Sequence, residues 1–341
     1  MQTILTGIRI NSDLHLGHFL GVILPMTRLA NQHSHDSHIN IFVPDLHSII
    51  GDIDGDLQRN IIDSLKIFLA AGLQINDHIH FYRQSYVPAH SELTWILDTV
   101  ATMGETSRMI QYKEKSDDGK ESANVGIFNY PILMAADILL YDATYVPVGE
   151  DQFQHLELAR NLAERFNNKF GDVFTLPAKT SDQAKFMGQL DGNGIRIRSL
   201  TNPEKKMSKS DPSESSKIML IESPDSAAKK IMSATTDSVG KIQFDMFNQP
   251  GISNLLQIES LFTNQPLQTI ISSWTGEINY GDLKTQVATT VSTTLAEFQS
   301  RLAEISDDDT IHELLKAGEI YANGVANAKL LEVQKCLGLR D

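Results

Sequence analysis

Residues 3–18 read TILTGIRINSDLHLGH, and this stretch indicates how the N-terminal part of the chain folds. Apolar and polar side chains alternate from Thr3 to Ile10, which is the pattern of a strand with one buried face. Apolar residues at helical spacing follow from Gly17 through Leu29, so a helix is expected to begin near Gly17. A strand that leads into a helix through a short loop is the first unit of a parallel α/β sheet.

The same alternation continues along the N-terminal half of the chain. Further strands are expected at residues 39–43, 80–82 and 145–148, with helices at 57–73 and 152–166. Strands that alternate with helices predict a parallel, Rossmann-like sheet, so the expected fold class is α/β.

The strand pattern ends after Pro203. Residues 255–262, 280–305 and 310–337 have helical spacing instead. We therefore expect a Rossmann-like domain over residues 1–200 and a helical C-terminal domain over residues 201–341. The last helix is expected to pack back on the first domain.

Length and composition limit the class of protein. The chain has 341 residues, of which 41% are hydrophobic, so it is long enough to bury a sizeable core. A single cysteine, Cys336, excludes a disulfide or a cysteine-based metal site within the chain and favours a reducing, cytoplasmic location. Neither a signal peptide nor a membrane segment is expected, because no basic region precedes an apolar run and no apolar run is long enough to cross a bilayer.

The charge distribution is uneven. A formal net charge of −14 disfavours nonspecific nucleic-acid binding. Lysines nevertheless cluster at 113–120 and 205–209, so one specific polyanionic partner is not excluded.

The motif His15-Leu16-Gly17-His18 lies where the first strand ends and the first helix begins. In an open parallel sheet, ligands bind beyond the carboxyl ends of the strands, and a helix N-terminus offers unpaired N–H groups to an anion. Gly17 has no side chain, so a nucleotide can lie against the backbone there, between two histidines that donate to phosphate. Two ordinary histidines at a helix cap would give the same pattern, and this alternative stays open for the motif alone.

A second motif, Lys206-Met207-Ser208-Lys209-Ser210, is a compact loop of basic and hydroxyl side chains. Two ammonium groups on a short loop suit a polyphosphate, on which negative charge increases when the leaving group departs. The serine hydroxyls add further donors. A solvated lysine-rich turn is the alternative, but the two motifs in this order favour a site that holds a nucleoside triphosphate from both sides.

The two motifs resemble the signature sequences of the class I aminoacyl-tRNA synthetases. Four further segments resemble the bacterial tryptophanyl-tRNA synthetases, and the similarity runs from Gly7 to the last helix. These segments are YPILMAADILL at 130–140, VPVGEDQ at 146–152, QYKEKS at 111–116 and PGISNLL at 250–256. The chain departs from the family pattern at residues 10–12 and at Leu5, His15 and His18.

The resemblance implies a two-step reaction. The carboxylate of L-tryptophan attacks the α-phosphate of ATP, with Mg²⁺ present, to give tryptophanyl-adenylate and pyrophosphate, and the amino acid is then transferred to tRNA(Trp). The resemblance implies no protein nucleophile and no metal ligand from protein side chains, so catalysis comes from positioning and from charge neutralisation at the phosphates.

The resemblance also implies the domain roles and the assembly. Residues 1–200 would be the catalytic domain, and residues 201–341 would carry the KMSKS loop and the helical domain that binds the tRNA anticodon. A homodimer would pair through residues 88–142. The apolar side chains of Trp95, Ile96, Val100 and Met103 would supply that contact or belong to the core.

By motif match, three groups of residues are expected to form the site. The catalytic residues are His15, His18, Lys115, Lys206 and Lys209. The ATP-binding residues are Arg9, Ile10, Asn11, Gly17, His18, Gly149, Glu150, Asp151, Ile197, Lys206, Met207, Ser208, Lys209 and Ser210. The tryptophan-binding residues are Leu5, Gly7, His47, Tyr130, Met134, Asp137, Val146, Val148 and Gln152.

Asp137 carries the expected selectivity, because its carboxylate would accept the indole N–H. Phenylalanine has no such donor, and a site built around one hydrogen bond rejects an analogue that lacks it by about 10⁴-fold or more. The alternative is a helix carboxylate that faces solvent. The apolar neighbours Met134 and Ile138 disfavour it.

Three other classes of protein remain open at this stage. A tyrosyl-tRNA synthetase shares the fold and the reaction, although the Met-Ala-Ala-Asp segment at 134–137 favours tryptophan. Small nucleotidyltransferases, such as pantetheine-phosphate adenylyltransferases, share a histidine–glycine–histidine site but lack the long helical C-terminal region. A non-catalytic paralogue that binds RNA or senses tryptophan would have no need of Lys206, Lys209 and Asp137 together.

Overall fold

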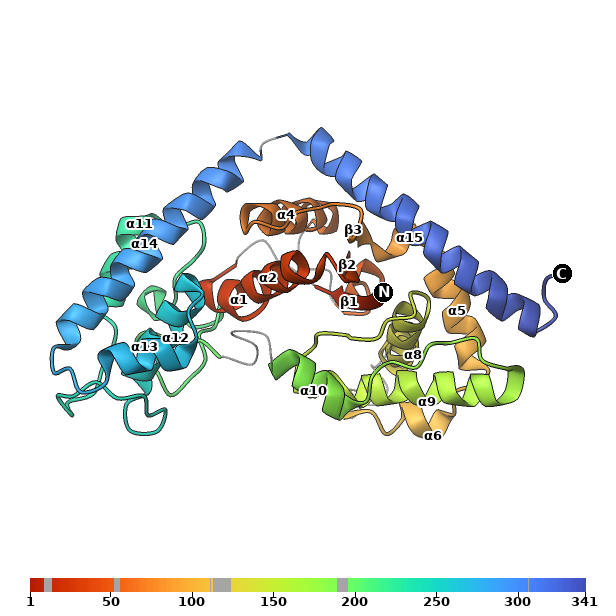
Figure 1. The fold of residues 1–341 in the computed structure, drawn as a ribbon, viewed down its shortest axis with the longest axis horizontal. Coiled ribbons are helices and arrows are strands. Elements are labelled where there is room, and N and C mark those ends of the chain that lie inside the picture. Colours follow the sequence, from red (N-terminus) through yellow and green to blue (C-terminus); the bar gives the residue numbers. More distant parts are fainter. Residues whose placement is uncertain (9–13, 52–55, 111, 113–123, 189–195, 306) are drawn as a thin grey trace.

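The computed structural model describes all residues except 9–13, 52–55, 111, 113–123, 189–195 and 306. Its parallel sheet has the order β1 (Gln2–Gly7), β2 (Ser37–Val43) and β3 (Ile79–Arg83). The register places Ile4 opposite Ile39, and Ile39 opposite Ile79. A parallel sheet with helices on both faces is the α/β, Rossmann-like fold that the sequence predicts (Figure 1).

The two faces of the sheet belong to two different cores. Ile4, Ile39 and Phe81 point to one face, where they pack with side chains of α2 and α4. Leu5, Phe42 and Tyr82 point to the other face, where they pack with side chains of α5, α8, α9 and α15. Because successive side chains of a strand alternate in direction, each strand is apolar on both sides, as a sheet covered by helices on both faces requires.

The first crossover is one helical stretch in three parts. It consists of α1 (Leu16–His18), a π-helical turn η1 (Phe19–Ile23) and α2 (Leu24–His33), so the helix expected from Gly17 to Leu29 is present. The second crossover contains α3 (Asp45–Ser48) and α4 (Leu57–Ala70). Asp56 caps α4, because its Oδ1 accepts from the backbone N–H groups of Gln58 and Arg59.

Several helices follow β3 in the N-terminal half. Their bounds are η2 (Gln84–Tyr86), α5 (Ala89–Asp98), α6 (Met103–Thr106), α8 (Val125–Leu139), η3 (Glu150–Gln152), α9 (Phe153–Phe170) and α10 (Thr180–Gly188). α8 packs between α5 and α9, and its buried face includes Ala135, Ala136 and Asp137.

The predicted strand at 145–148 is wrong. Tyr145 forms an isolated parallel bridge with Ile4, and the N–H of Leu5 donates to the carbonyl of Tyr145 (2.9 Å). The pairing stops there because Pro147 is the next residue whose N–H would face β1, and it has no N–H to donate; the N–H of Val146 points away from β1 and donates to the side chain of Gln183 (3.0 Å). The segment therefore lies beside β1 as extended chain.

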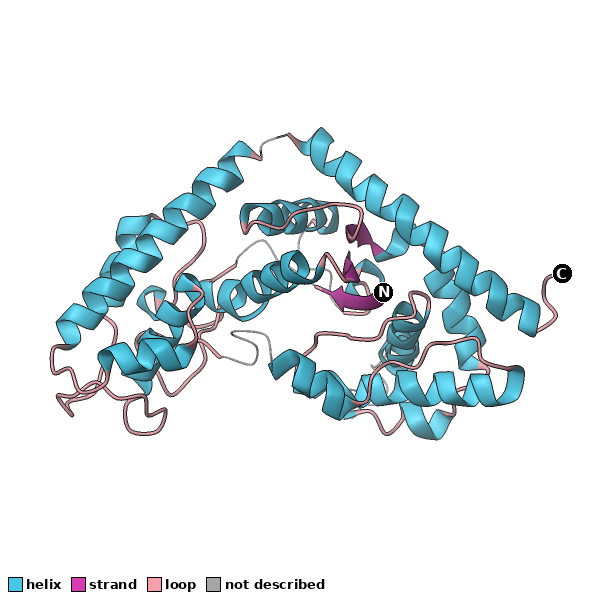
Figure 2. Ribbon diagram, in the orientation of Figure 1, coloured by secondary structure: helices cyan, strands magenta, loops and turns pink. Residues whose placement is uncertain are grey.

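The C-terminal part is helical, as Figure 2 shows. Its elements are η4 (Glu214–Ser216), α11 (Pro224–Met232), α12 (Pro250–Thr263), α13 (Leu267–Trp274), α14 (Tyr280–Glu304) and α15 (Asp308–Cys336). α12 lies in the middle of this group and packs against α13 and α14. α14 and α15 slope away from each other over the rest of the molecule (Figure 1).

α15 packs along β3, α4 and α5. The contact is close at Gly318, where an added Cβ would lie 2.1 Å from the carbonyl oxygen of Phe81 on β3. Arg83 at the end of β3 forms an ion pair with Glu319 of α15. The C-terminal helix and the sheet are therefore in contact through their backbones.

Candidate active site

An open cleft of about 1170 Å³ lies beyond the carboxyl end of β1. Its wall contains the end of β1, the first turns of the α1–α2 stretch, the segment around 147–153, the end of α10 and the segment around 196–207. The expected site residues on this wall are Gly7, His15, Gly17, His18, Val148, Gly149, Asp151, Gln152, Ile197, Lys206 and Met207. The fold thus brings the two sequence motifs to one cavity, as their combined interpretation requires.

His15 has a structural task as well as a place on the cleft wall. Its Nδ1 accepts from the backbone N–H of Gly17 (3.1 Å), which caps α1. In the neutral ring, Nε2 then carries the proton and is the nitrogen left to donate to a ligand. Burial first, and then the charges of His18, Lys217 and Lys206, lower the pKa of His15 to about 4, so the ring is neutral at pH 7.

The ring of His18 stacks on that of His15, with 4.2 Å between centroids. Burial and the nearby Lys206 also lower the pKa of His18. Both rings are thus polar, largely uncharged donors at neutral pH, and the positive charge of this corner comes from lysine.

Gly17 is required by His15 as well as by any ligand. A Cβ at this position would lie 2.9 Å from Cε1 of the His15 ring, which already lies over the glycine. The interpretation that Gly17 leaves its backbone bare for a nucleotide is therefore incomplete, because a side chain here would first displace His15.

The basic loop presents only its first half to the cleft. The N–H of Met207 donates to the carbonyl of Ile197 (2.9 Å), and Met207 is buried, so this end of the loop is anchored. Lys206 and Met207 lie on the cleft wall, whereas Ser208, Lys209 and Ser210 do not. The exposed hydroxyls of Ser208 and Ser210 lie 2.9 Å apart and contact each other.

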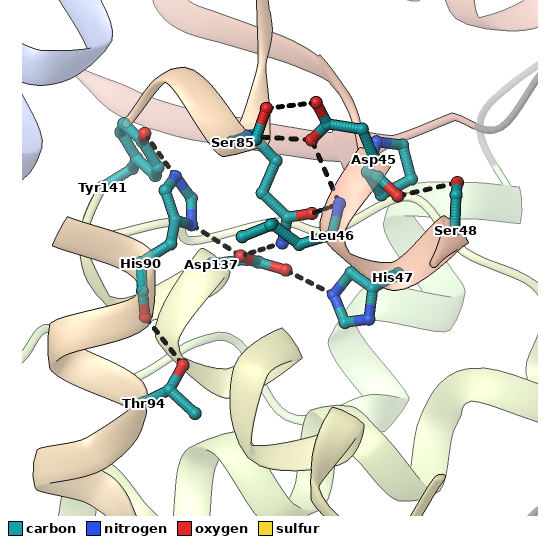
Figure 3. A network of polar contacts seen from close by, with 11 residues as sticks. Asp45, Leu46, His47, Ser48, Ser85, His90, Thr94, Asp137 and Tyr141 are labelled. Carbon is teal, nitrogen blue, oxygen red and sulfur yellow. Dashed lines mark hydrogen bonds and ion pairs between the residues drawn. The ribbon is translucent and has the colours of Figure 1, made fainter. Parts of the chain in front are cut away.

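Asp137 is 1% exposed, so the solvent-facing alternative is excluded. Three side chains from other elements converge on its carboxylate (Figure 3). Oδ1 accepts from Gln84 Nε2 (2.7 Å) and from His90 Nδ1 (2.6 Å), and Oδ2 accepts from His47 Nε2 (2.8 Å). His90 in turn lies with Nε2 2.9 Å from the hydroxyl of Tyr141.

These contacts keep Asp137 ionised. Burial alone would raise its pKa, but the hydrogen bonds and charges of His47 and His90 outweigh burial and lower the pKa to about 2. Each carboxylate oxygen has two lone pairs, and among the described residues Oδ2 receives one hydrogen bond while Oδ1 receives two. Oδ2 is thus the atom with capacity for one more donor.

Three of the expected tryptophan-binding residues line the cleft, and six are buried or half-buried away from its wall. Gly7, Val148 and Gln152 line the cleft. The others, which are Leu5, His47, Tyr130, Met134, Asp137 and Val146, do not reach its wall. Tyr130 contacts two histidines. Its hydroxyl lies 3.0 Å from Nε2 of His155 on α9, and its ring packs edge to face against that of His47.

Some expected site residues lie outside the described part of the chain. These are Arg9, Ile10, Asn11 and Lys115, and of Glu150 only the backbone is described. Sequence reasoning also missed three residues that the fold brings in: Arg196, which lines the cleft, and Gln84 and His90 beside Asp137. For His90 the available signal was its helical spacing with Leu93 and Leu97, which places it on the buried face of α5.

The described residues contain no cluster of three histidine, cysteine or carboxylate side chains placed to hold a metal ion. No helix in the described part of the chain is long and apolar enough to span a membrane.

The comparison with protein families agrees with this geometry. The family of tRNA synthetases class I (W and Y) matches residues 1–296, so the chain belongs to the class I tRNA synthetases of this group. Within the class, the chain is 42% identical to a tryptophan–tRNA ligase of Caldanaerobacter subterraneus subsp. tengcongensis, over 99% of each sequence.

Solved structures agree as well. The fold matches the tryptophanyl-tRNA synthetase of Mycoplasma pneumoniae with a TM-score of 0.79 and 33% identity, over 100% of this chain and 98% of that one. It also matches the Campylobacter jejuni enzyme complexed with ADP and tryptophan, with a TM-score of 0.74 and 30% identity, over 99% of this chain and 100% of that one.

Proposed function

We propose that this chain is a tryptophan–tRNA ligase. In the first step a carboxylate oxygen of L-tryptophan forms a bond to the α-phosphorus of ATP, the bond to the bridging oxygen breaks, and pyrophosphate leaves. In the second step a ribose hydroxyl at the end of tRNA(Trp) attacks the carbonyl carbon of tryptophanyl-adenylate, and AMP leaves. The observation that carries the proposal is that His15, Gly17 and His18 of the first motif and Lys206 of the second line one cleft, while the carboxylate of Asp137 is buried.

Charge neutralisation at the phosphates is the task of the cleft in this proposal. Lys206 supplies the positive charge, and the neutral ring of His15 donates from Nε2 without adding repulsion between cations. Lys209 lies off the cleft wall, so its part in the reaction requires its side chain to move toward the phosphates. Donors aimed at the charge that develops in the transition state accelerate such a step.

Mg²⁺ would arrive with ATP. The described residues offer no carboxylate cluster for it, and the triphosphate itself supplies oxygen ligands that suit the ion. When bound, it would neutralise charge on the departing pyrophosphate.

Recognition of tryptophan rests on Asp137. Gln84 and His90 occupy both acceptor positions of Oδ1 and hold the carboxylate in place, so Oδ2 is the atom offered to the indole N–H. A phenylalanine side chain would leave this charged acceptor short of a donor, which accounts for rejection of that amino acid.

Residues 1–200 would bind ATP and tryptophan, and residues 201–341 would bind the anticodon region of tRNA(Trp). The place of action would be the cytoplasm, where ATP and tRNA meet. Among the alternatives, a tyrosyl-tRNA synthetase is not favoured, because three relatives that are 40–42% identical over 99% of the chain are tryptophan–tRNA ligases.

The chain would act as a homodimer through residues 88–142. Trp95 and Met103 are 72% and 74% exposed, and a contiguous patch of such apolar side chains would mark an interface. Ile96, by contrast, is 5% exposed and belongs to the core of one subunit.

Exchange of labelled pyrophosphate into ATP tests the proposal. We expect exchange that depends on L-tryptophan and not on L-tyrosine, followed by charging of a tRNA(Trp) transcript. Exchange with tyrosine alone would select the tyrosyl alternative. Exchange with neither amino acid would favour the non-catalytic paralogue, which equilibrium binding of tryptophan would then detect.

A further inference from the structure

Lys217 is a buried lysine outside both motifs that contacts the second of them. It follows η4, and only 6% of it is exposed. Its Nζ donates to the carbonyl oxygens of Lys209 (3.2 Å) and Asp211 (2.6 Å), on either side of Ser210. Its remaining partner is Glu214 (3.4 Å), whose side chain is largely exposed, so this ion pair contributes little.

The backbone next to Lys217 pairs with the start of the first motif. The N–H of Leu16 donates to the carbonyl of Ile218 (2.8 Å), and the N–H of Leu220 donates to the carbonyl of Leu14 (3.0 Å). Between them, His15 and Met219 form an antiparallel bridge. The segment that begins one residue after Lys217 is therefore fixed to the backbone from which His15 reaches the cleft.

The backbone of Lys217 is held from a third side. Its carbonyl accepts from Lys230 Nζ (3.0 Å), and Lys230 pairs with Glu222. Glu222 also accepts from the N–H of Met219 (3.1 Å), so it connects Lys230 to the segment that follows Lys217. The ammonium group of Lys217 thus extends from a backbone that is held on several sides, whereas the loop segment it contacts is exposed.

We propose that Lys217 is a positioning residue that fixes the second half of the basic loop relative to the first motif. The side chain of Lys217 donates to the carbonyls of Lys209 and Asp211, and it connects this exposed stretch to the paired backbone segments at 14–16 and 218–220. The inference rests on the proposed function, since the quantity that Lys217 sets is the path along which Lys209 approaches the phosphates.

Burial of the Lys217 ammonium group is stable only if its hydrogen bonds compensate for the loss of hydration. Moving an ammonium group out of water is costly, and its charge adds to that of Lys206 beside His15, as the lowered pKa of His15 reflects. Two carbonyl partners offset that cost and give the side chain a direction. An error of about 1 Å in the placement of a catalytic group reduces a rate by up to about 100-fold, so loss of this contact has a kinetic consequence.

The test compares K217M, which keeps the length and apolar body of the side chain but removes the charge, with K217R and with the unmodified chain. Lys229 is an exposed lysine of α11, and K229M serves as the matched control. Tryptophan-dependent pyrophosphate exchange is measured at saturating ATP, together with KM for tryptophan and the melting temperature.

We expect K217M to lower kcat by about 10-fold to 100-fold, with KM for tryptophan within about twofold of the unmodified value. K217R restores most of the rate because it keeps the charge and the donors, and K229M has no effect. K217Q, which is too short to reach both carbonyls, is judged by the same criteria if K217M does not fold.

A kcat of K217M within twofold of the unmodified chain overturns the proposal. A decrease in kcat that K217R does not restore also overturns it. So does a decrease in kcat that is accompanied by a rise of KM for tryptophan by the same factor, because general damage to the site would produce that result. The proposed function fails separately, when the unmodified chain itself shows no exchange with tryptophan.

Discussion

Replacement of Asp137 by asparagine tests the proposed basis of amino-acid selection. The variant keeps the size of the side chain and converts one carboxylate oxygen into an NH₂ group. Two donors, Gln84 and His90, contact Oδ1, so the amide oxygen is expected to take that place. The NH₂ group then occupies the Oδ2 position, where it cannot accept from His47 or from an indole N–H.

The magnitude follows from the contacts that are lost. A hydrogen bond to a charged group contributes about 1.5–3 kcal/mol, and leaving a buried donor unpaired costs about 1–3 kcal/mol. A combined loss of about 2.5–6 kcal/mol corresponds to a decrease of about 70-fold to 25,000-fold in kcat/KM. Discrimination against phenylalanine is expected to fall as well, because part of it depends on the same acceptor.

Tryptophan-dependent pyrophosphate exchange measures kcat/KM, and D98N is the matched control. Asp98 is a half-buried carboxylate of α5 that accepts from Asn129 (3.2 Å) and takes no part in the Asp137 network. We expect D98N to stay within about twofold of the unmodified chain. A folded D137N that keeps kcat/KM for tryptophan within threefold of the unmodified value would refute the reasoning.

Three further predictions concern protonation, packing and assembly. The ring of His15 is expected to titrate near pH 4 in an NMR titration, and a midpoint near 6.5 would contradict the burial argument. The contribution of the neutral ring to the free energy of unfolding is full above about pH 6.5. It is lost as pH falls toward 4, because the unfolded chain binds the proton first. Gly318→Ala should lower the free energy of unfolding, measured in urea, by about 1–3 kcal/mol, since its Cβ would meet the backbone of Phe81. Gly324→Ala on the same helix has open space around its Cβ and should raise the free energy of unfolding by up to about 1 kcal/mol. Equal effects of the two substitutions would argue against the close contact. Trp95→Glu should convert a dimer into monomers in sedimentation velocity, and an unmodified chain that is fully active as a monomer would rule out the proposed assembly.

Many helices and strands could be predicted from the sequence because the hydrophobic periodicity that specifies them is local. The periodicity of residues 57–73 predicted α4, and that of 280–305 predicted α14, to within a few residues at each end. The predicted strand at 145–148 was wrong for a reason that is also local. Pro147 stands where the next N–H toward β1 would be needed, and it has none to donate.

Individual residues of the candidate site could be predicted from the sequence, but the contacts between residues far apart in the chain could not. The burial of Asp137 followed from its apolar neighbours, but its partners Gln84 and His90 come from 53 and 47 residues earlier in the chain. No spacing rule relates positions so far apart. His15 was assigned as a phosphate donor, and the structure also uses its Nδ1 to cap its own helix, which depends on a side-chain rotation that sequence does not specify.

The close contact between α15 and β3 has a consequence for the behaviour of shortened chains. β3 is the last strand of the sheet, and its outward carbonyl at Phe81 faces the helix at Gly318. A chain cut before Asp308 would leave this strand with unpaired backbone groups open to water, and such an edge templates the addition of strands from other molecules. The terminal helix therefore protects this edge of the sheet against aggregation, and removal of α11 to α14 alone would be better tolerated if α15 were kept.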